Sequence, residues 1–292
     1  MNASAALLPD RSVLEVVGED RLSFLQGLVT NDVEGLAERE GRFTGLLSPQ
    51  GKILFDFFVV SAGDAFLIDC SSELAANLTK RLALYRLRAK VTIADVSDRW
   101  RVGAAWGEGA SEWAEANAPV IYPDPRLPAL GFRLLVLGSH QPEFSASFAD
   151  YEVMRIAFAV PEGGKDYAYG DAFPHEACLD LLHGVSFKKG CFVGQEVVSR
   201  MQHRGTARMR VLAASAEQSL PQGGADILAG GLTVGKLGSV AGRQGIALAR
   251  VDRVKEALKK GQTFTAGGVG VEFAAPAWAS YSLDPKPAGA TH

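Results

Sequence analysis

The apolar residues in the first half of the chain recur with the spacing of strands and helices in turn. Residues 12–17 alternate as in a strand, and residues 20–28 have the apolar spacing of a helix, with Asp20 as its expected cap. Two strand-like runs, 43–47 and 53–60, flank the turn Ser48-Pro49-Gln50-Gly51, a typical hairpin signal. The remaining predictions are strands at 65–69, 91–96, 102–106 and 132–137, and helices at 73–86 (capped by Ser72), 108–117 and 151–158. This mixture predicts an α+β fold.

The pattern changes after Gly205. Short β-branched runs separated by glycines extend from 207 to 273, which predicts a small β-barrel of roughly 75 residues. We therefore expect an α+β region at 1–205, with two lobes divided near 100–150, a barrel at 206–283 and a loose tail at 284–292.

One stretch of the barrel region has the glycine and lysine spacing of a P-loop, from Gly230 to Lys236. Leu237 stands where a P-loop needs Ser or Thr to bind magnesium, and the flanking residues have the pattern of strands. The sequence therefore favours a barrel hairpin over a nucleotide site.

Composition limits the classes of protein to consider. The chain has 292 residues, 47% hydrophobic and 22% charged, as in ordinary soluble globular proteins. Its net charge of −3 argues against general binding of nucleic acid. Cys70, Cys178 and Cys191 form no CxxC pair, which fits neither a disulfide framework nor a zinc knuckle. With no signal peptide and no long apolar run, the sequence predicts a cytoplasmic protein without a membrane span.

Residues 188–196 (KKGCFVGQE) combine a lone thiol, two glycines, a carboxamide and a carboxylate, and the bases Arg200, His203 and Arg204 follow closely. A packing segment has little use for this mixture, because lysine and arginine resist burial and glycine weakens regular elements. The sequence therefore predicts a functional site here.

Cys191 lies just before a predicted helix at 194–203. Backbone N–H groups and the helix dipole favour a thiolate at such a position, and Lys188 and Lys189 act in the same direction. Cys191 is therefore a candidate nucleophile, redox group or soft-metal ligand. Glu196 is a candidate acceptor for two parallel hydrogen bonds from an amidine-like edge such as that of a pterin, and Gln195 lies beside it.

A second interpretation of this stretch is structural. Cys191 and Phe192 would then fill a core, and Glu196 and Arg200 would form a surface pair one helical turn apart. The residues alone leave both interpretations open. No metal site is predicted, because the histidine spacings around the stretch match no common zinc pattern.

The stretch from Lys189 to Gly205 (KGCFVGQEVVSRMQHRG) resembles the signature of the YgfZ-type folate-binding proteins, which are relatives of the glycine cleavage T-protein, an aminomethyltransferase. Residues 24–27 (FLQG) with 30–32 (TND) resemble that family's N-terminal motif, and residues 46–56 (LLSPQGKILFD) resemble its hairpin. Residues 174–187 resemble the run before the signature. The resemblance covers about residues 12–205.

This resemblance implies a ring of two T-protein-like α+β lobes plus a barrel, around a pocket for tetrahydrofolate or a one-carbon derivative. It implies an accessory factor for iron–sulfur cluster assembly or repair. Its partners would be folate and, transiently, cluster enzymes or assembly proteins, including those that serve tRNA modification, without direct nucleic-acid or membrane contact. The implied catalytic residues are Cys191 and Lys189, and the implied folate ligands are Glu196, Gln195, Asn31, Asp56, Arg200 and Tyr167.

The alternative is a folate-dependent aminomethyl- or methyltransferase. The T-protein's pterin-binding glutamate falls where this chain has Ala157, within the run Arg155 to Ala159, and its paired aspartates fall where this chain has Phe55-Asp56. Because these acids are incomplete, the sequence leaves enzyme activity open and favours the non-transferase. It does not identify client proteins, oligomeric state or the chemical role of Cys191.

Overall fold

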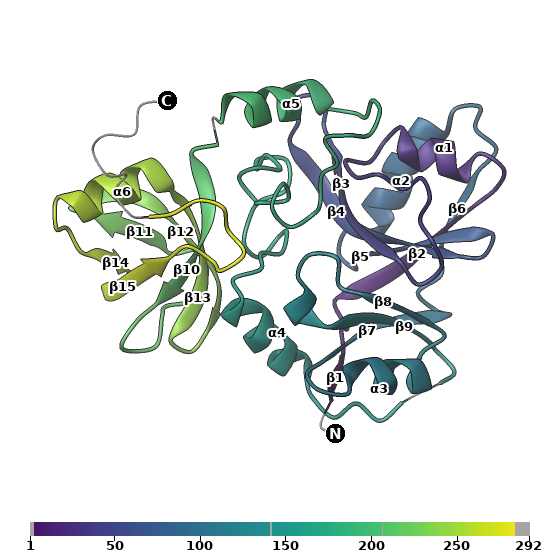
Figure 1. The fold of residues 1–292 in the computed structure, drawn as a ribbon, viewed down its shortest axis with the longest axis horizontal. Coiled ribbons are helices and arrows are strands. Elements are labelled where there is room, and N and C mark those ends of the chain that lie inside the picture. Colours follow the sequence, from purple (N-terminus) through teal and green to yellow (C-terminus); the bar gives the residue numbers. More distant parts are fainter. Residues whose placement is uncertain (1–2, 141, 206, 284–292) are drawn as a thin grey trace. The chain divides into compact units, whose positions relative to one another are not determined.

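The computed structural model describes residues 3–140, 142–205 and 207–283 (Figure 1). The chain forms two compact units. The first comprises Met1–Glu152 and Leu182–Ser199, and the second comprises Val153–Leu181 and Arg200–His292. The sequence grouped residues 153–181 with the N-terminal region, whereas their contacts group them with the barrel. The predicted tail at 284–292 lies outside the described residues.

A five-stranded antiparallel sheet, in the order β3-β4-β5-β2-β6, forms the larger part of the first unit. Leu78 and Leu82 of its second helix share a buried core with Phe57 and Ile68 of the sheet. The predicted hairpin is confirmed, since β3 and β4 pair across the turn after Leu47. The elements are β2 (Arg11–Val17), α1 (Arg21–Gln26), β3 (Gly41–Leu47), β4 (Ile53–Ala62), β5 (Ala65–Ser71), α2 (Ala75–Arg86) and β6 (Thr92–Asp95).

A second sheet, in the order β1-β7-β9-β8, completes the first unit. Its core contains the small residues Ala110 and Ala114 of helix α3, which pack against Ile121 and Leu134 of the sheet. The sequence pattern missed strands β1 and β8, each of four residues. The elements are β1 (Ser4–Leu7), β7 (Trp100–Trp106), α3 (Ala110–Asn117), β8 (Val120–Pro123), η1 (Pro128–Leu130) and β9 (Phe132–Leu137).

The second unit is built around a closed barrel in the order β10-β13-β12-β11-β14-β15, which confirms the predicted barrel (Figure 1). The P-loop-like spacing falls on the hairpin between β11 and β12, as predicted. Helix α6 was not predicted, because charged residues surround its two buried positions, Val254 and Ala257. The strands are β10 (Met209–Ser215), β11 (Asp226–Ala229), β12 (Leu232–Ala241), β13 (Gln244–Arg250), β14 (Phe264–Ala266) and β15 (Val269–Ala274). Helix α6 (Val251–Lys259) belongs to the second unit, while the boundary between the units falls within α4 (Phe148–Ala157) and within α5 (Gln195–Arg204).

Buried charges lie between the two sheets of the first unit. Asp69 of β5 is fully buried and accepts hydrogen bonds from Arg11 Nε at 2.6 Å and from Arg133 Nε at 2.8 Å. Asp124 accepts from Arg126 Nη2 at 2.7 Å. Burial acts to raise the pKa of Asp124, but the guanidinium groups of Arg126 and Arg133 outweigh it and hold that pKa below its usual value. The two sheets are therefore joined by ion pairs that water does not screen.

A second buried ion pair fixes the segment after α4 to the barrel within the second unit. Arg155 is fully buried, and its Nη1 donates to Asp166 Oδ2 at 2.8 Å. The other oxygen of Asp166 accepts from the backbone N–H of Ser239 at 2.7 Å. That N–H lies at the irregularity of β12 between Leu237 and Val240, where strand pairing is interrupted. The bulge thus supplies the donor that holds residue 166.

Of the two predicted helix caps, Asp20 is right in position but makes no capping bond, and Ser72 is wrong. Asp20 stands at the N-cap of α1, but its carboxylate accepts from the backbone N–H of Lys90 at 2.7 Å and makes no capping bond. Ser72 does not cap α2, which begins after Leu74, and its hydroxyl pairs with that of Ser12. The side chains that the sequence assigned to helix caps therefore bond to residues distant in the chain. Over the described ranges, no helix has the length and apolar character needed to cross a membrane.

We expect Asp69→Asn to lower the free energy of unfolding by about 3–5 kcal/mol, because it removes the buried carboxylate that Arg11 and Arg133 share and leaves Arg133 with Asp124 at 3.8 Å. Asp64→Asn is the matched control. Its carboxylate is solvent-exposed and 3.9 Å from Arg21, so we expect a change within about 0.5 kcal/mol. Urea denaturation measures both values. Equal stability of the two variants would contradict the role given to the buried network.

Candidate functional site

Residues 183–194, here called the thiol loop, carry Cys191 and are fixed by the side chain of Lys189. The Lys189 ammonium donates to the backbone carbonyls of Gln26 at 2.8 Å, Val29 at 2.6 Å and Asn31 at 2.9 Å. These carbonyls lie at the end of helix α1 and just after it, more than 150 residues earlier in the chain. All three N–H bonds of the ammonium are therefore used on the main chain.

Two opposing effects act on the pKa of Lys189. Burial lowers the pKa of Lys189 to about 8, while the carboxylates of Asp32 and Glu34 act to raise it. Its three carbonyl acceptors also favour the ammonium, because a neutral amine has only two N–H bonds to offer. The ring of Phe192 lies 5.4 Å from the ammonium and adds a cation–π contact. The predicted catalytic role of Lys189 is untested, and the contacts that the structure gives it are structural.

Asn31 and Thr30 join the same two segments from the other side. Asn31 Nδ2 donates to the carbonyl of His183 at 2.6 Å and to that of Phe43 at 2.8 Å. Thr30 Oγ1 donates to the carbonyl of Gly184 at 2.6 Å. Both amide hydrogens of Asn31 are thus used on the backbone, and its side-chain oxygen accepts the backbone N–H of Asp32 at 2.8 Å. Its role as a folate ligand stays a prediction.

Two glycines bring the thiol loop against the hairpin of β3 and β4. Gly194 has φ +80°, and a Cβ there would lie 2.6 Å from the carbonyl oxygen of Ser48. Gly51 has the same φ, and a Cβ there would meet the side chain of Val197 at 2.9 Å. Neither glycine can carry a side chain in this arrangement. Two motifs that the sequence showed separately are therefore in backbone contact.

The three cysteines have contrasting surroundings. Cys70 and Cys178 are buried and Cys191 is exposed. Burial raises the pKa of Cys70 to about 12 and also raises that of Cys178, which keeps both thiols protonated. The structural interpretation of the loop is right for Phe192, which is buried, and wrong for Cys191. Cys191 is thus the thiol that solvent and partners can reach.

The remaining predicted site residues lie in several places. Gln195 and Glu196 form the first turn of α5, close to Cys191, with Gln195 half-buried and Glu196 exposed. Asp56 is buried on β4 opposite Gly45 of β3. Arg200 is exposed on the part of α5 that belongs to the second unit. The structure therefore groups Cys191, Gln195 and Glu196 locally in the first unit, with Lys189 beneath the loop.

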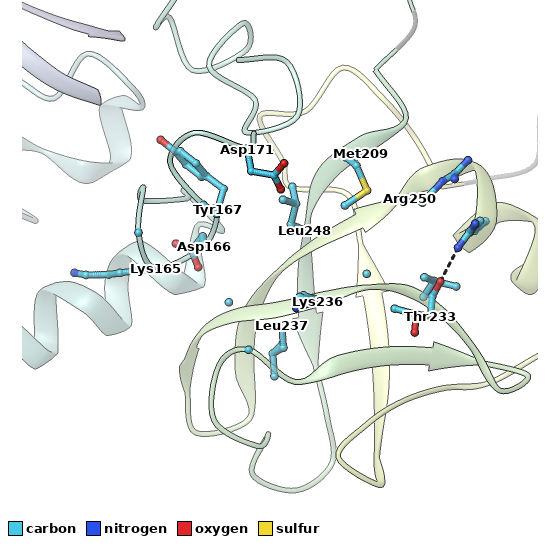
Figure 2. A pocket seen from close by; sticks show the side chains of 17 residues that line it. Lys165, Asp166, Tyr167, Asp171, Met209, Thr233, Lys236, Leu237, Leu248 and Arg250 are labelled. Carbon is cyan, nitrogen blue, oxygen red and sulfur yellow. Dashed lines mark hydrogen bonds between the residues drawn. The ribbon is translucent and has the colours of Figure 1, made fainter. Parts of the chain in front are cut away.

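Tyr167 lies in the second unit, at a groove of about 540 Å³ between residues 164–171 and the barrel. It is buried, and its ring meets that of Tyr169 edge-on with centroids 6.0 Å apart. Figure 2 shows the Tyr167 ring turned away from the barrel strands, while Asp171 is turned toward Leu248 and Met209. The role of Tyr167 as a folate ligand stays a prediction.

Thr30 and Thr44 are the residues of this site that sequence reasoning missed. Thr44 Oγ1 accepts the backbone N–H of Asn31 at 3.0 Å, and Thr30 Oγ1 accepts that of Gly45 at 2.8 Å. Thr30 is the first residue of the polar run Thr30-Asn31-Asp32, so the sequence contained a signal for its role. A polar run within an apolar neighbourhood indicates side chains that bond to the main chain.

Comparison with known proteins identifies the family. The chain is 34% identical over 285 residues to the human protein named "Iron-sulfur cluster assembly factor IBA57, mitochondrial", in a match that covers 86% of this chain and 78% of that protein. The chain belongs to the IBA57 family. Residues 208–281 also match the family model described as the C-terminal beta-barrel domain of CAF17.

Fungal relatives of the IBA57 family extend well beyond the matched region. The homologue from Neurospora crassa is 31% identical over 237 residues, which cover 73% of this chain and 53% of that protein. The homologue from Mycosarcoma maydis is 32% identical, over 71% of this chain and 56% of that protein. The chain therefore spans about half the length of these curated relatives.

A solved structure confirms the predicted fold class. The glycine cleavage system aminomethyltransferase T from Bartonella henselae superposes with a TM-score of 0.77 at 14% identity, over 95% of this chain and 86% of that one. The resemblance to T-protein relatives is thus confirmed for the fold and for the IBA57 family, while the YgfZ branch stays a prediction. The cytoplasmic location predicted from the sequence is wrong, because the matched IBA57 relatives are named as mitochondrial proteins.

We expect Lys189→Met to lower the free energy of unfolding by about 2 kcal/mol or more, because three buried carbonyls lose their donor. Lys188→Met changes an exposed neighbour and serves as the control, with an expected effect within about 0.5 kcal/mol. Urea denaturation of both variants makes the comparison. If Lys189→Met is as stable as Lys188→Met, the ammonium does not hold the loop.

We expect Gly194→Ala to destabilise the IBA57-family fold by roughly 1–3 kcal/mol, since the new methyl group meets the Ser48 carbonyl oxygen and the backbone keeps a positive φ. Gly190→Ala is the matched control four residues earlier, where an added Cβ meets nothing within 4 Å. Thermal unfolding followed by circular dichroism distinguishes the two. A smaller loss in Gly194→Ala than in Gly190→Ala would argue against close packing of loop and hairpin.

Proposed function

We propose that this IBA57-family chain is a tetrahydrofolate-binding accessory factor for iron–sulfur cluster assembly or repair, and that Cys191 is its reactive thiol. The observation that carries the proposal is the match to human IBA57, whose name gives iron–sulfur cluster assembly as its role. The exposure of Cys191, in contrast to the two buried cysteines, supports the assignment of the thiol.

The loop around Cys191 suits a thiol that must meet another molecule. Lys189 and Asn31 anchor the loop before Cys191, and Gly194 seats it after Cys191. The thiol is therefore presented to solvent from a loop fixed on both sides. A fixed loop lowers the conformational entropy lost on binding, so a cluster-carrying partner meets a preorganised ligand. The iron–sulfur cluster is cargo in this proposal, and Cys191 is the side chain that would contact it.

The start of α5 supplies groups that fit the pterin edge of a folate. Glu196 offers a carboxylate and Gln195 a carboxamide on adjacent positions. A carboxylate accepts two parallel hydrogen bonds from an amidine-like edge, and the Gln195 carboxamide, whose oxygen accepts the backbone N–H of Phe192 at 3.4 Å, adds its N–H donors. When bound, tetrahydrofolate supplies nitrogen atoms that can carry a one-carbon unit. Glu196 and Gln195 would bind and orient that edge.

The proposal excludes aminomethyl transfer. Ala157 ends α4 where the T-protein has its pterin-binding glutamate, and an alanine can neither hold nor move a proton. Asp56 is the single acid of the hairpin, beside Phe55. The proposed role of folate here is therefore binding, with the cysteine as the group that acts.

We expect Cys191→Ala to fold normally and to abolish support of iron–sulfur enzymes in cells that lack their own factor, because an exposed thiol contributes little to packing. Cys70→Ala is the matched control. It removes a buried thiol, so we expect it to reduce stability and to retain activity in proportion to the amount of folded protein. Activity of a cluster-dependent enzyme is the readout. Full complementation by Cys191→Ala would rule out the thiol.

Folate binding is tested separately by titration of the purified protein with tetrahydrofolate. We expect micromolar binding that Glu196→Ala weakens roughly tenfold or more and that Cys191→Ala leaves within about twofold, because a charged hydrogen bond contributes more than an adjacent thiol. No binding by the unmodified protein would remove folate from the proposal and leave the thiol to be judged by complementation.

A further inference from the structure

Two leucines at the C-terminal end of α2 are exposed to solvent, where they contribute nothing to the core. Leu84 is 70% exposed and Leu87 is 88% exposed, whereas Leu78 and Leu82 of the same helix are buried in the core. Leu84 therefore lies on the helix face opposite the sheet. Burial in the first unit accounts for neither exposed leucine.

Leu87 is also held in a strained backbone conformation. It follows the last residue of α2 with φ +45°, a region that disfavours every residue with a Cβ. The chain is fixed three residues later, where Asp20 accepts the backbone N–H of Lys90 at 2.7 Å and the carbonyl oxygen of Lys90 lies against Gly18. An exposed side chain in a strained backbone gains nothing for stability, which points to function.

Cations surround these leucines. Residues 75–90 contain five lysines and arginines and no carboxylate. Lys80, Arg81, Arg86 and Arg88 are exposed, and over the described part of the chain their side chains make no hydrogen bond or ion pair. The whole protein has a net charge of −3, so the positive charge is a local feature. An anionic ligand could therefore neutralise these four cations without breaking an existing hydrogen bond or ion pair.

A hollow of about 470 Å³ lies beside Leu87 and is lined by Arg86, Arg88 and Lys90. Its one acid, Glu19, is already paired with the Lys90 ammonium at 2.7 Å. The walls thus offer guanidinium donors next to a protruding leucine. This combination suits a phosphate headgroup beside an acyl chain.

We propose that Lys80, Arg81, Leu84, Arg86, Leu87 and Arg88, here called the α2 tip, are a docking surface for an anionic phospholipid membrane. The leucines would enter the boundary between headgroups and acyl chains, and the cations would contact lipid phosphates. A protein partner is disfavoured, because a standard protein interface buries about 800 Å² of each partner around an apolar core, and two leucines are too small a core for an interface of that size. Such peripheral docking requires no helix that crosses the membrane, and the described residues contain none.

The test is co-sedimentation with phosphatidylcholine vesicles that contain phosphatidylserine, and with pure phosphatidylcholine vesicles as reference. We expect the protein to bind only the anionic vesicles and to be released as salt rises. Each lost cation should weaken binding roughly fivefold. Lys80→Glu with Arg88→Glu should abolish it, while the charge-matched control Arg243→Glu with Lys259→Glu, on the barrel unit, should retain it.

The leucines are tested by Leu84→Ser, which should weaken vesicle binding at least tenfold, against Leu232→Ser, which changes an equally exposed leucine (72%) of the barrel and should have no effect. Leu87→Gly separates docking from folding. Glycine accepts the positive φ, so this variant should melt about 2 °C higher than the parent while losing vesicle binding. The proposal is overturned if the unmodified protein stays in the supernatant with anionic vesicles, as expected of a surface for an acidic protein, or if Leu87→Gly binds them as tightly.

Discussion

The Lys189 ammonium on three backbone carbonyls is the interaction on which the candidate site depends. It joins the segment after α1 to the thiol loop, two parts of the chain that no strand pairing connects. Removing such a charge from water is costly, and it is tolerated only when every N–H finds an acceptor. Lys189 thus gives the loop a fixed shape, and its predicted catalytic role beside Cys191 stays a prediction.

This constraint explains why so many polar residues of the site face inward. Thr30, Asn31 and Thr44 use their side chains on backbone groups of neighbouring segments, as Lys189 does. A loop without regular structure leaves its N–H and C=O groups without the partners that a helix or a sheet would supply, and side chains must then supply them. Motif residues that look like ligands in a sequence can therefore be the framework that carries one exposed group, here Cys191.

The sequence was sufficient for the fold class, the hairpin and the barrel, because each depends on periodicity and turn residues that are local. It failed where a distant partner decides. The carboxylate of Asp20 bonds Lys90 instead of capping its own helix, and Ser72 bonds Ser12. The grouping of residues 153–181 with the barrel likewise rests on the buried pair of Arg155 and Asp166. Asp166 bonds the backbone N–H of Ser239, which strand pairing leaves free at a bulge of β12. No single-sequence pattern encodes that bulge.

Whether a polar side chain has a hydrogen-bond partner also distinguishes the residues that support the fold from the surface residues proposed to bind another molecule. Buried polar groups of the first unit, such as Asp69 and Lys189, have partners at hydrogen-bond distance, and their cost is offset inside the protein. The side chains of the α2 tip have no such partners in the described structure, and Leu87 adds backbone strain. A fold selected only for stability would remove that strain with one glycine. Its presence beside four uncommitted cations is therefore an argument for a second molecule that contacts this surface, independent of the chemistry at Cys191.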